Sequence, residues 1–127
     1  MPDIVEFFIP LFFEIQKHWA FGYINRITAK VHVFNSLRSD ATFVEAKKRL
    51  LQITAVEYPD VLFECVQAVC PQQSNGVDCG VFSLMFMIMC SQGKDVNNIQ
   101  QKYMNYFRKY LAVKLLAIDS GAFMFSY

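Results

Sequence analysis

In the middle of this chain, a segment rich in Gln, Ser, Asn and Gly leads directly into an apolar one: Pro71-Gln72-Gln73-Ser74-Asn75-Gly76-Val77-Asp78-Cys79-Gly80-Val81-Phe82. The apolar residues continue to Cys90 and predict a buried helix, because the run is shorter than the roughly 20 residues that span a bilayer. Asn75-Gly76 favours a turn, and Asp78 is a residue type that caps helices. We therefore expect Cys79 at the N-terminus of this helix, where unpaired N–H groups favour a thiolate over a thiol.

Four other segments are rich in β-prone residues and predict strands. The first is interrupted by Pro10, which lacks a backbone N–H and so indicates an edge strand or a bend. The second and third are joined by a turn-like region at Asn25. The four segments are Ile4–Phe13, Trp19–Ile24, Lys30–Phe34 and Val61–Val69.

Two further segments have helical spacing. Thr42-Phe43-Val44-Glu45 fits a capping box, and the helix that it would begin must end before Pro59. Near the C-terminus, apolar and aromatic residues recur on one face of a long final helix: Ile99, Tyr103, Tyr106, Tyr110, Val113 and Ala117. The order of elements predicts a mixed α/β or α+β domain with helices packed against a small sheet.

The composition limits the class of protein. The chain has 127 residues, of which 54% are hydrophobic and 18% charged, with 13 Phe and a net charge of +1. This size predicts one domain, residues 1–127, and the charge argues against nucleic acid as the main partner. The N-terminus lacks the basic region of a signal peptide, and no segment predicts a membrane span. Four cysteines without a Cys-x-x-Cys pair and two distant histidines do not have zinc-ligand spacing. We expect reduced thiols in the nucleus or cytoplasm.

Several residues have the types that nucleophilic catalysis requires. Cys79 is a candidate nucleophile, whereas Cys65 and Cys90 lie in apolar runs and are expected to act as small core residues, the commoner fate of a cysteine. Gln73, six residues before Cys79, could offer an amide to an oxyanion, although Gln72 is an equal candidate by composition.

Two residues far upstream could complete such a site. His18 at a strand start is the candidate base, and Asn35 the candidate orienter of its ring. His32 lies in the middle of a predicted strand and is expected to be structural or exposed.

The blocks His18-Trp19, Phe34-Asn35-Ser36-Leu37 and Gln73 to Phe82, in this order, resemble the catalytic domain of the SUMO (sentrin)-specific cysteine proteases. This family cleaves ubiquitin-like proteins and includes NEDD8-cleaving and adenoviral relatives. The resemblance covers about residues 9–116, including Ile9-Pro10 and Tyr106-Phe107-Arg108-Lys109.

The resemblance implies an α+β, papain-like fold with permuted order of the catalytic residues. It implies that Cys79 is the nucleophile, His18 the general base and then acid, and Gln73 the oxyanion donor. Trp19 matches an aromatic residue that covers the Gly-Gly tail of the substrate. The implied partner is a ubiquitin-like modifier of the SUMO or NEDD8 type, without a metal or cofactor.

Two departures from the family pattern support an alternative. Asn35 stands where most of the family has Asp, so that no negative charge faces the imidazole. The family's domain also begins well before its catalytic His, whereas only 17 residues precede His18 here, and residues 118–127 match nothing in the family pattern. These departures predict either a partial, unstable or self-associating protease domain, or a weak or inactive remnant that at most binds a partner.

Overall fold

The computed structural model of the chain describes residues 5–119. Four strands form one sheet in the order β1-β2-β3-β4. They are β1 (Glu6–Phe13), β2 (His18–Asn25), β3 (Lys30–Phe34) and β4 (Glu64–Gln67). The first three are antiparallel neighbours, and β4 runs parallel to β3. Pro10 therefore lies in an edge strand, as its missing N–H predicts.

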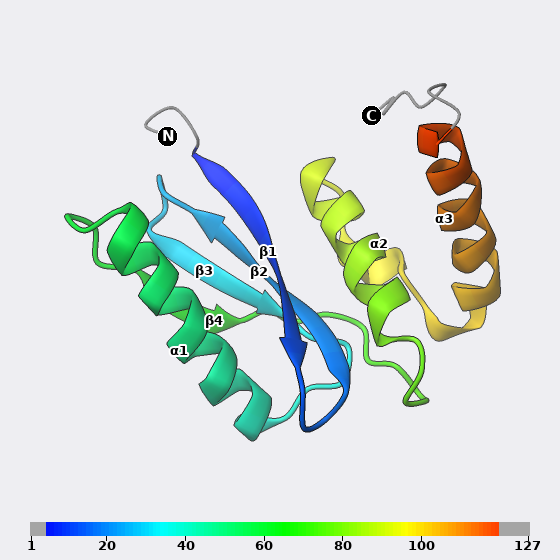
Figure 1. Cartoon of the computed structure of the whole chain (residues 1–127), viewed down its shortest axis with the longest axis horizontal. Coiled ribbons are helices and arrows are strands. Elements are labelled where there is room, and N and C mark those ends of the chain that lie inside the picture. Colours follow the sequence, from blue (N-terminus) through cyan, green and yellow to red (C-terminus); the bar gives the residue numbers. More distant parts are fainter. Residues whose placement is uncertain (1–4, 120–127) are drawn as a thin grey trace.

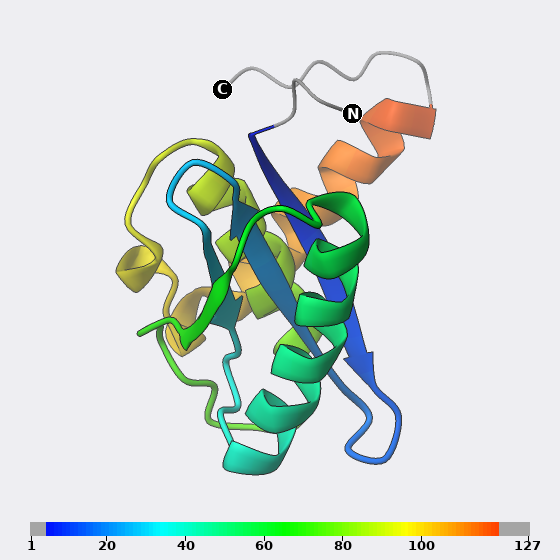
Figure 2. The same ribbon diagram turned by 90° about the vertical axis from the view of Figure 1, so that its left-hand side faces the viewer.

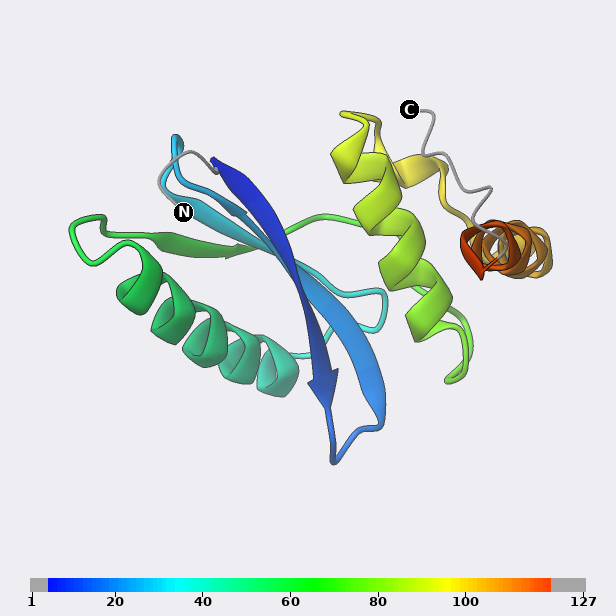
Figure 3. The same ribbon diagram turned by 45° about the horizontal axis from the view of Figure 1, so that its top comes forward.

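The helices lie on both faces of this sheet, giving three layers (Figure 1, Figure 3). Helix α1 (Asp40–Glu57) covers one face, and Figure 2 shows it running along the strands. Helix α2 (Cys79–Ser91) lies on the other face, with α3 (Met104–Asp119) outside it. Two short 3-10 turns, η1 (Val96–Asn98) and η2 (Gln101–Tyr103), connect α2 to α3. The predicted α+β class with a small sheet flanked by helices is confirmed.

Successive side chains of β2 point to opposite faces of the sheet and so belong to two separate hydrophobic cores. Ala20 and Ile24 pack with Leu50 of α1, whereas Phe21 packs with Phe82 of α2 and its neighbours. Gly22 faces α1 so closely that an added Cβ would lie 2.6 Å from a methyl carbon of Leu50. The sheet thus holds α1 and α2 at fixed positions on its opposite faces.

Two predicted boundaries and one predicted face are wrong. Helix α1 begins at Asp40, because the Ser39 hydroxyl accepts a hydrogen bond from Thr42 N at 3.2 Å and is the cap. The last helix begins at Met104 rather than near Ile99, and the preceding 3-10 turns shift its phase. Tyr106 and Val113 are therefore exposed. The face of α3 that packs against α2 consists of Met104, which is buried, and of Phe107, Tyr110 and Leu111, which are partly buried, so Tyr110 lies on it as predicted.

The strand before the cysteine loop is also shorter than Val61–Val69, since only four of these residues pair with β3. Among the helices of the described residues, none combines the length and apolar character needed to cross a membrane. The predicted tail, residues 118–127, lies almost wholly outside the described residues.

Candidate active site

His18 and Asn35 form a buried pair where β2 begins and β3 ends. Both side chains are buried, and His18 Nε2 is hydrogen-bonded to Asn35 Oδ1. The same oxygen accepts from Leu37 N at 2.9 Å, while Asn35 Nδ2 donates to Thr42 Oγ1 at 3.1 Å. These two contacts fix the orientation of the amide. Because an amide oxygen only accepts, His18 carries its proton on Nε2, and its Nδ1 is left as the basic nitrogen.

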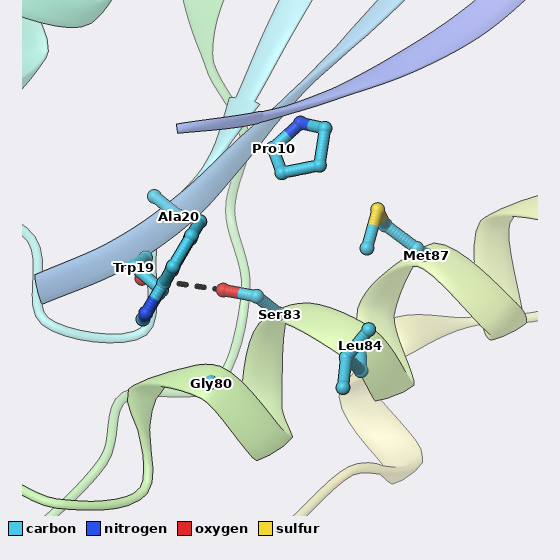
Figure 4. Close-up of a pocket in the computed structure, with 7 residues that line it drawn as sticks. All are labelled: Pro10, Trp19, Ala20, Gly80, Ser83, Leu84 and Met87. Atoms are coloured by element: carbon cyan, nitrogen blue, oxygen red, sulfur yellow. Dashed lines mark hydrogen bonds between the residues drawn. The ribbon is translucent and has the colours of Figure 1, made fainter. Parts of the chain in front are cut away.

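Cys79 is the first residue of α2, as the sequence predicts, and it lies beside the strand that begins with His18. Trp19 N donates to Cys79 Sγ at 3.4 Å. One turn further along the helix, Ser83 Oγ donates to Trp19 O at 3.2 Å (Figure 4). Both backbone polar groups of Trp19 are thus bound by α2. The structure brings Cys79 next to the residue that follows His18, although none of the hydrogen bonds within residues 5–119 joins the sulfur to the imidazole directly.

The structure distinguishes the two glutamines that the sequence left equal. Gln72 Nε2 donates to Asn35 O at 2.8 Å, and Gln72 Oε1 accepts from Arg38 N at 2.8 Å. This amide therefore links the loop after β3 to the loop before α2. Gln73 is buried, and its Oε1 accepts from Ser36 Oγ at 2.5 Å. Its Nε2 donates one hydrogen to Asn75 O at 2.5 Å. Nε2 keeps a second hydrogen, and the role of Gln73 as an oxyanion donor stays a prediction.

Asp78 occupies the N-cap position of α2, but the prediction that its side chain caps the helix is wrong. The carboxylate makes no capping hydrogen bond. It accepts instead from Arg108, Asn75 and Gln101. Burial raises the pKa of Asp78, but the hydrogen bonds from these three side chains outweigh it and hold the pKa below the usual range.

Sequence reasoning missed Arg108 and Gln101. They lie 30 and 23 residues after Asp78 in the chain. Arg108 and Lys109 together have the pattern of an ordinary basic cluster on a solvated helix face. The segment Tyr106 to Lys109 is part of the family resemblance, which assigns no role to Arg108. Buried carboxylates are usually paired with a cation, and this general rule is the signal that could have pointed to a basic partner of Asp78.

Trp19 lies at the edge of a pocket that adjoins the start of α2, where Cys79 is the first residue. The residue is 43% exposed, and its ring packs against Phe12 with ring centroids 4.9 Å apart. The pocket has a volume of about 360 Å³, and Figure 4 shows its lining residues: Pro10, Trp19, Ala20, Gly80, Ser83, Leu84 and Met87. The exposed ring next to Cys79 suits the predicted contact of Trp19 with a substrate, which stays a prediction.

The remaining thiols and the second histidine have the environments of core or strand residues, although Cys70 Sγ donates to Asn35 O at 3.5 Å. Burial raises the pKa of Cys65 and of Cys70, and that of Cys90 to about 11, so these three are thiols at neutral pH. His32 lies within β3, where burial first and Lys30 second lower its pKa. Within the described part of the chain, no group of three or more His, Cys, Asp or Glu side chains could hold a metal ion.

Comparison with known proteins identifies the family. Residues 2–122 match the model of the Ulp1 protease family, C-terminal catalytic domain. The chain belongs to this family. A sentrin-specific protease of Caenorhabditis elegans is 27% identical to it in an alignment of 124 residues that covers 91% of this chain and 18% of that protein.

Solved structures of Ulp1 family members share the fold. The C-terminal Ulp1 protease domain in complex with Smt3, the yeast ortholog of SUMO, superposes with a TM-score of 0.76 at 24% identity, covering 86% of this chain and 51% of that one. The Ulp1-like SUMO protease catalytic domain of Chaetomium thermophilum gives a TM-score of 0.74, covering 90% and 46%. The chain therefore spans about half or less of each of these Ulp1 family relatives.

Proposed function

We propose that this chain is a cysteine-type peptidase that cleaves after the C-terminal Gly-Gly of a ubiquitin-like modifier of the SUMO type. The observation that carries the proposal is the pairing of His18 with Asn35 at the strand ends, with Cys79 at a helix start against the neighbouring peptide group. Membership in the Ulp1 protease family and the likeness to a domain solved with Smt3 support the same activity.

In the proposed reaction, each proton has a donor and an acceptor among these residues. His18 Nδ1 takes the proton of the Cys79 thiol, and the thiolate sulfur attacks the carbonyl carbon of the last glycine. The oxyanion that forms accepts hydrogen bonds from the Cys79 backbone N–H and from Gln73 Nε2. His18 then gives its proton to the leaving amine, and water hydrolyses the thioester to regenerate the thiol. Asn35 Oδ1 holds the ring through Nε2 during both transfers.

The test is covalent capture by a modifier that ends in an electrophile, such as a vinyl sulfone in place of the C-terminal carboxyl group. We expect the SUMO-type probe to label Cys79 with an increase in mass of one modifier, and the Cys79→Ala variant to remain unlabelled. A NEDD8-type probe run in parallel decides between the two modifiers. Labelling by neither probe in a folded sample would refute the proposal.

A remnant that only binds a modifier is the second candidate, and Asn35 is the observation that favours it. The same experiment separates the two functions, since binding without reaction gives a complex that dissociates in denaturant. A retained, non-covalent complex with both the native chain and Cys79→Ala would support the binding function.

A further inference from the structure

The residue directly before Cys79 has a charge that the reaction does not use. Asp78 is 6% exposed, and its carboxylate does not cap α2. A lone negative charge at this place opposes the formation of a thiolate on the next residue and offsets the positive potential of the helix N-terminus. A nucleophilic cysteine therefore needs this charge to be cancelled.

The donors around Asp78 divide between its two oxygens. Oδ2 accepts from the neutral amides of Asn75 and Gln101, each at 2.7 Å. Oδ1 forms the ion pair with Arg108, whose Nε lies at 3.1 Å and whose Nη2 also bonds to this oxygen. Neutral amides keep a carboxylate ionised but do not cancel its charge. Arg108 alone among these partners supplies an opposite charge.

Arg108 also reaches the loop backbone, because its Nη2 donates to Val77 O at 3.2 Å. Other charged or titratable side chains on the elements around the start of α2 include His18 of β2, Lys102 and Tyr103 of η2, and Lys109, Tyr110 and Lys114 of α3. Lys114 Nζ lies over the ring of Tyr110, 5.5 Å from its centroid. Lys102 Nζ lies over the ring of Tyr103, 5.0 Å from its centroid, and Lys109 is exposed. Arg108 is thus the cation that the structure joins to the residue before the nucleophile.

We propose that Arg108 is a positioning residue of the active site: it cancels the charge of Asp78, so that Cys79 ionises beside a neutral ion pair rather than beside a lone carboxylate. This inference rests on the proposed function, in which Cys79 is the nucleophile. Its test needs no substrate, so it can succeed or fail independently of the protease activity.

The test measures the rate at which iodoacetamide alkylates Cys79 as a function of pH, read from the mass of its peptide. The other three thiols react slowly near neutral pH because burial raises their pKa. We expect Arg108→Gln to move the midpoint of the profile upward by about one pH unit, and Asp78→Asn to move it downward. The double variant should return close to the native midpoint, because both charges are then absent.

Two further variants serve as controls. Lys109→Gln removes the same charge from the next residue of α3 and should leave the midpoint unchanged, and Arg108→Lys should keep most of the native behaviour. Circular dichroism checks that each variant is folded. A purely structural role of the ion pair predicts that the single variants shift the midpoint in the same direction, or not at all, and that the double variant is the most disturbed. Either result would overturn the inference. If Arg108→Gln does not fold, the direction of the shift in Asp78→Asn still decides.

Discussion

Replacement of Asn35 by aspartate places a negative charge next to the imidazole of His18. The pair is buried, and the amide oxygen already contacts His18 Nε2. The new carboxylate would keep two donors, His18 Nε2 and Leu37 N, and Thr42 Oγ1 could turn its hydroxyl toward the second oxygen. Asn35→Asp is therefore expected to fold with the same geometry.

The magnitude follows from two opposing charge interactions. At an effective dielectric constant of about 20, a carboxylate about 4 Å from an imidazolium attracts it by about 4.2 kcal/mol, and the same carboxylate about 7 Å from a thiolate repels it by about 2.4 kcal/mol. The net gain of about 1.8 kcal/mol would be a factor of about twenty in the population of the ion pair. The Asn35 amide dipole already supplies part of this, so we expect a rate increase of about tenfold.

The assay is hydrolysis of a fluorogenic substrate that ends in Gly-Gly, measured against pH for Asn, Asp and Ala at position 35. Asn35→Ala should lower the rate, since the ring of His18 loses its acceptor. Asn98→Asp, which adds the same charge at an exposed position of η1, should leave the rate unchanged. Equal rates for the three residues at position 35 would show that Asn35 does not orient His18, and the site would then consist of Cys79 and His18 alone.

Three further predictions concern other parts of the molecule. Gln73→Ala should reduce kcat by about a hundredfold, as loss of an oxyanion donor does, with little change in KM; a larger effect of Gln72→Ala on kcat would contradict this assignment. Since the folded-state pKa of Asp78 is lowered, its contribution to stability is present above the ordinary pKa of a carboxyl group and is lost as the pH falls through the folded value. Urea unfolding between about pH 5 and pH 2 should thus show a steeper loss of stability in the native chain than in Asp78→Asn, and equal slopes would refute it. Gly22→Ala should lower the free energy of unfolding by about 1–3 kcal/mol through the clash with buried Leu50, and an unchanged Tm would count against the packing described.

Local features were predictable from the sequence where the residues allowed only one interpretation. The start of α2 at Cys79 followed from a turn sequence next to an apolar run, and the edge position of β1 followed from Pro10. The start of α1 was not predictable, because Ser39 and Thr42 are both hydroxyl residues at plausible distances from the helix. Only the folded loop shows that Ser39 accepts the bond from Thr42 N.

Contacts between distant segments were harder to predict from the sequence. The pairing of His18 with Asn35 was suggested by residue type and strand order, and the structure confirms the contact. The ion pair between Asp78 and Arg108 joins segments 30 residues apart, and nothing in the local sequence of either residue points to the other. The face of α3 that packs against the core was likewise hard to predict, because it depends on two 3-10 turns that leave no periodic pattern in the sequence.

The two hydrogen bonds that hold Trp19 between Cys79 and Ser83 join α2, which begins with Cys79, to β2, which begins with His18. If Cys79 and His18 react as proposed, their alignment depends on the contact between α2 and the sheet, which the hydrophobic core around Phe21 and Phe82 fills. A slight separation of α2 from the sheet would then abolish the proposed activity while every strand and helix stayed intact. On heating, the molecule would lose activity before it lost secondary structure. Its turnover rate would therefore report how firmly α2 is attached to the sheet.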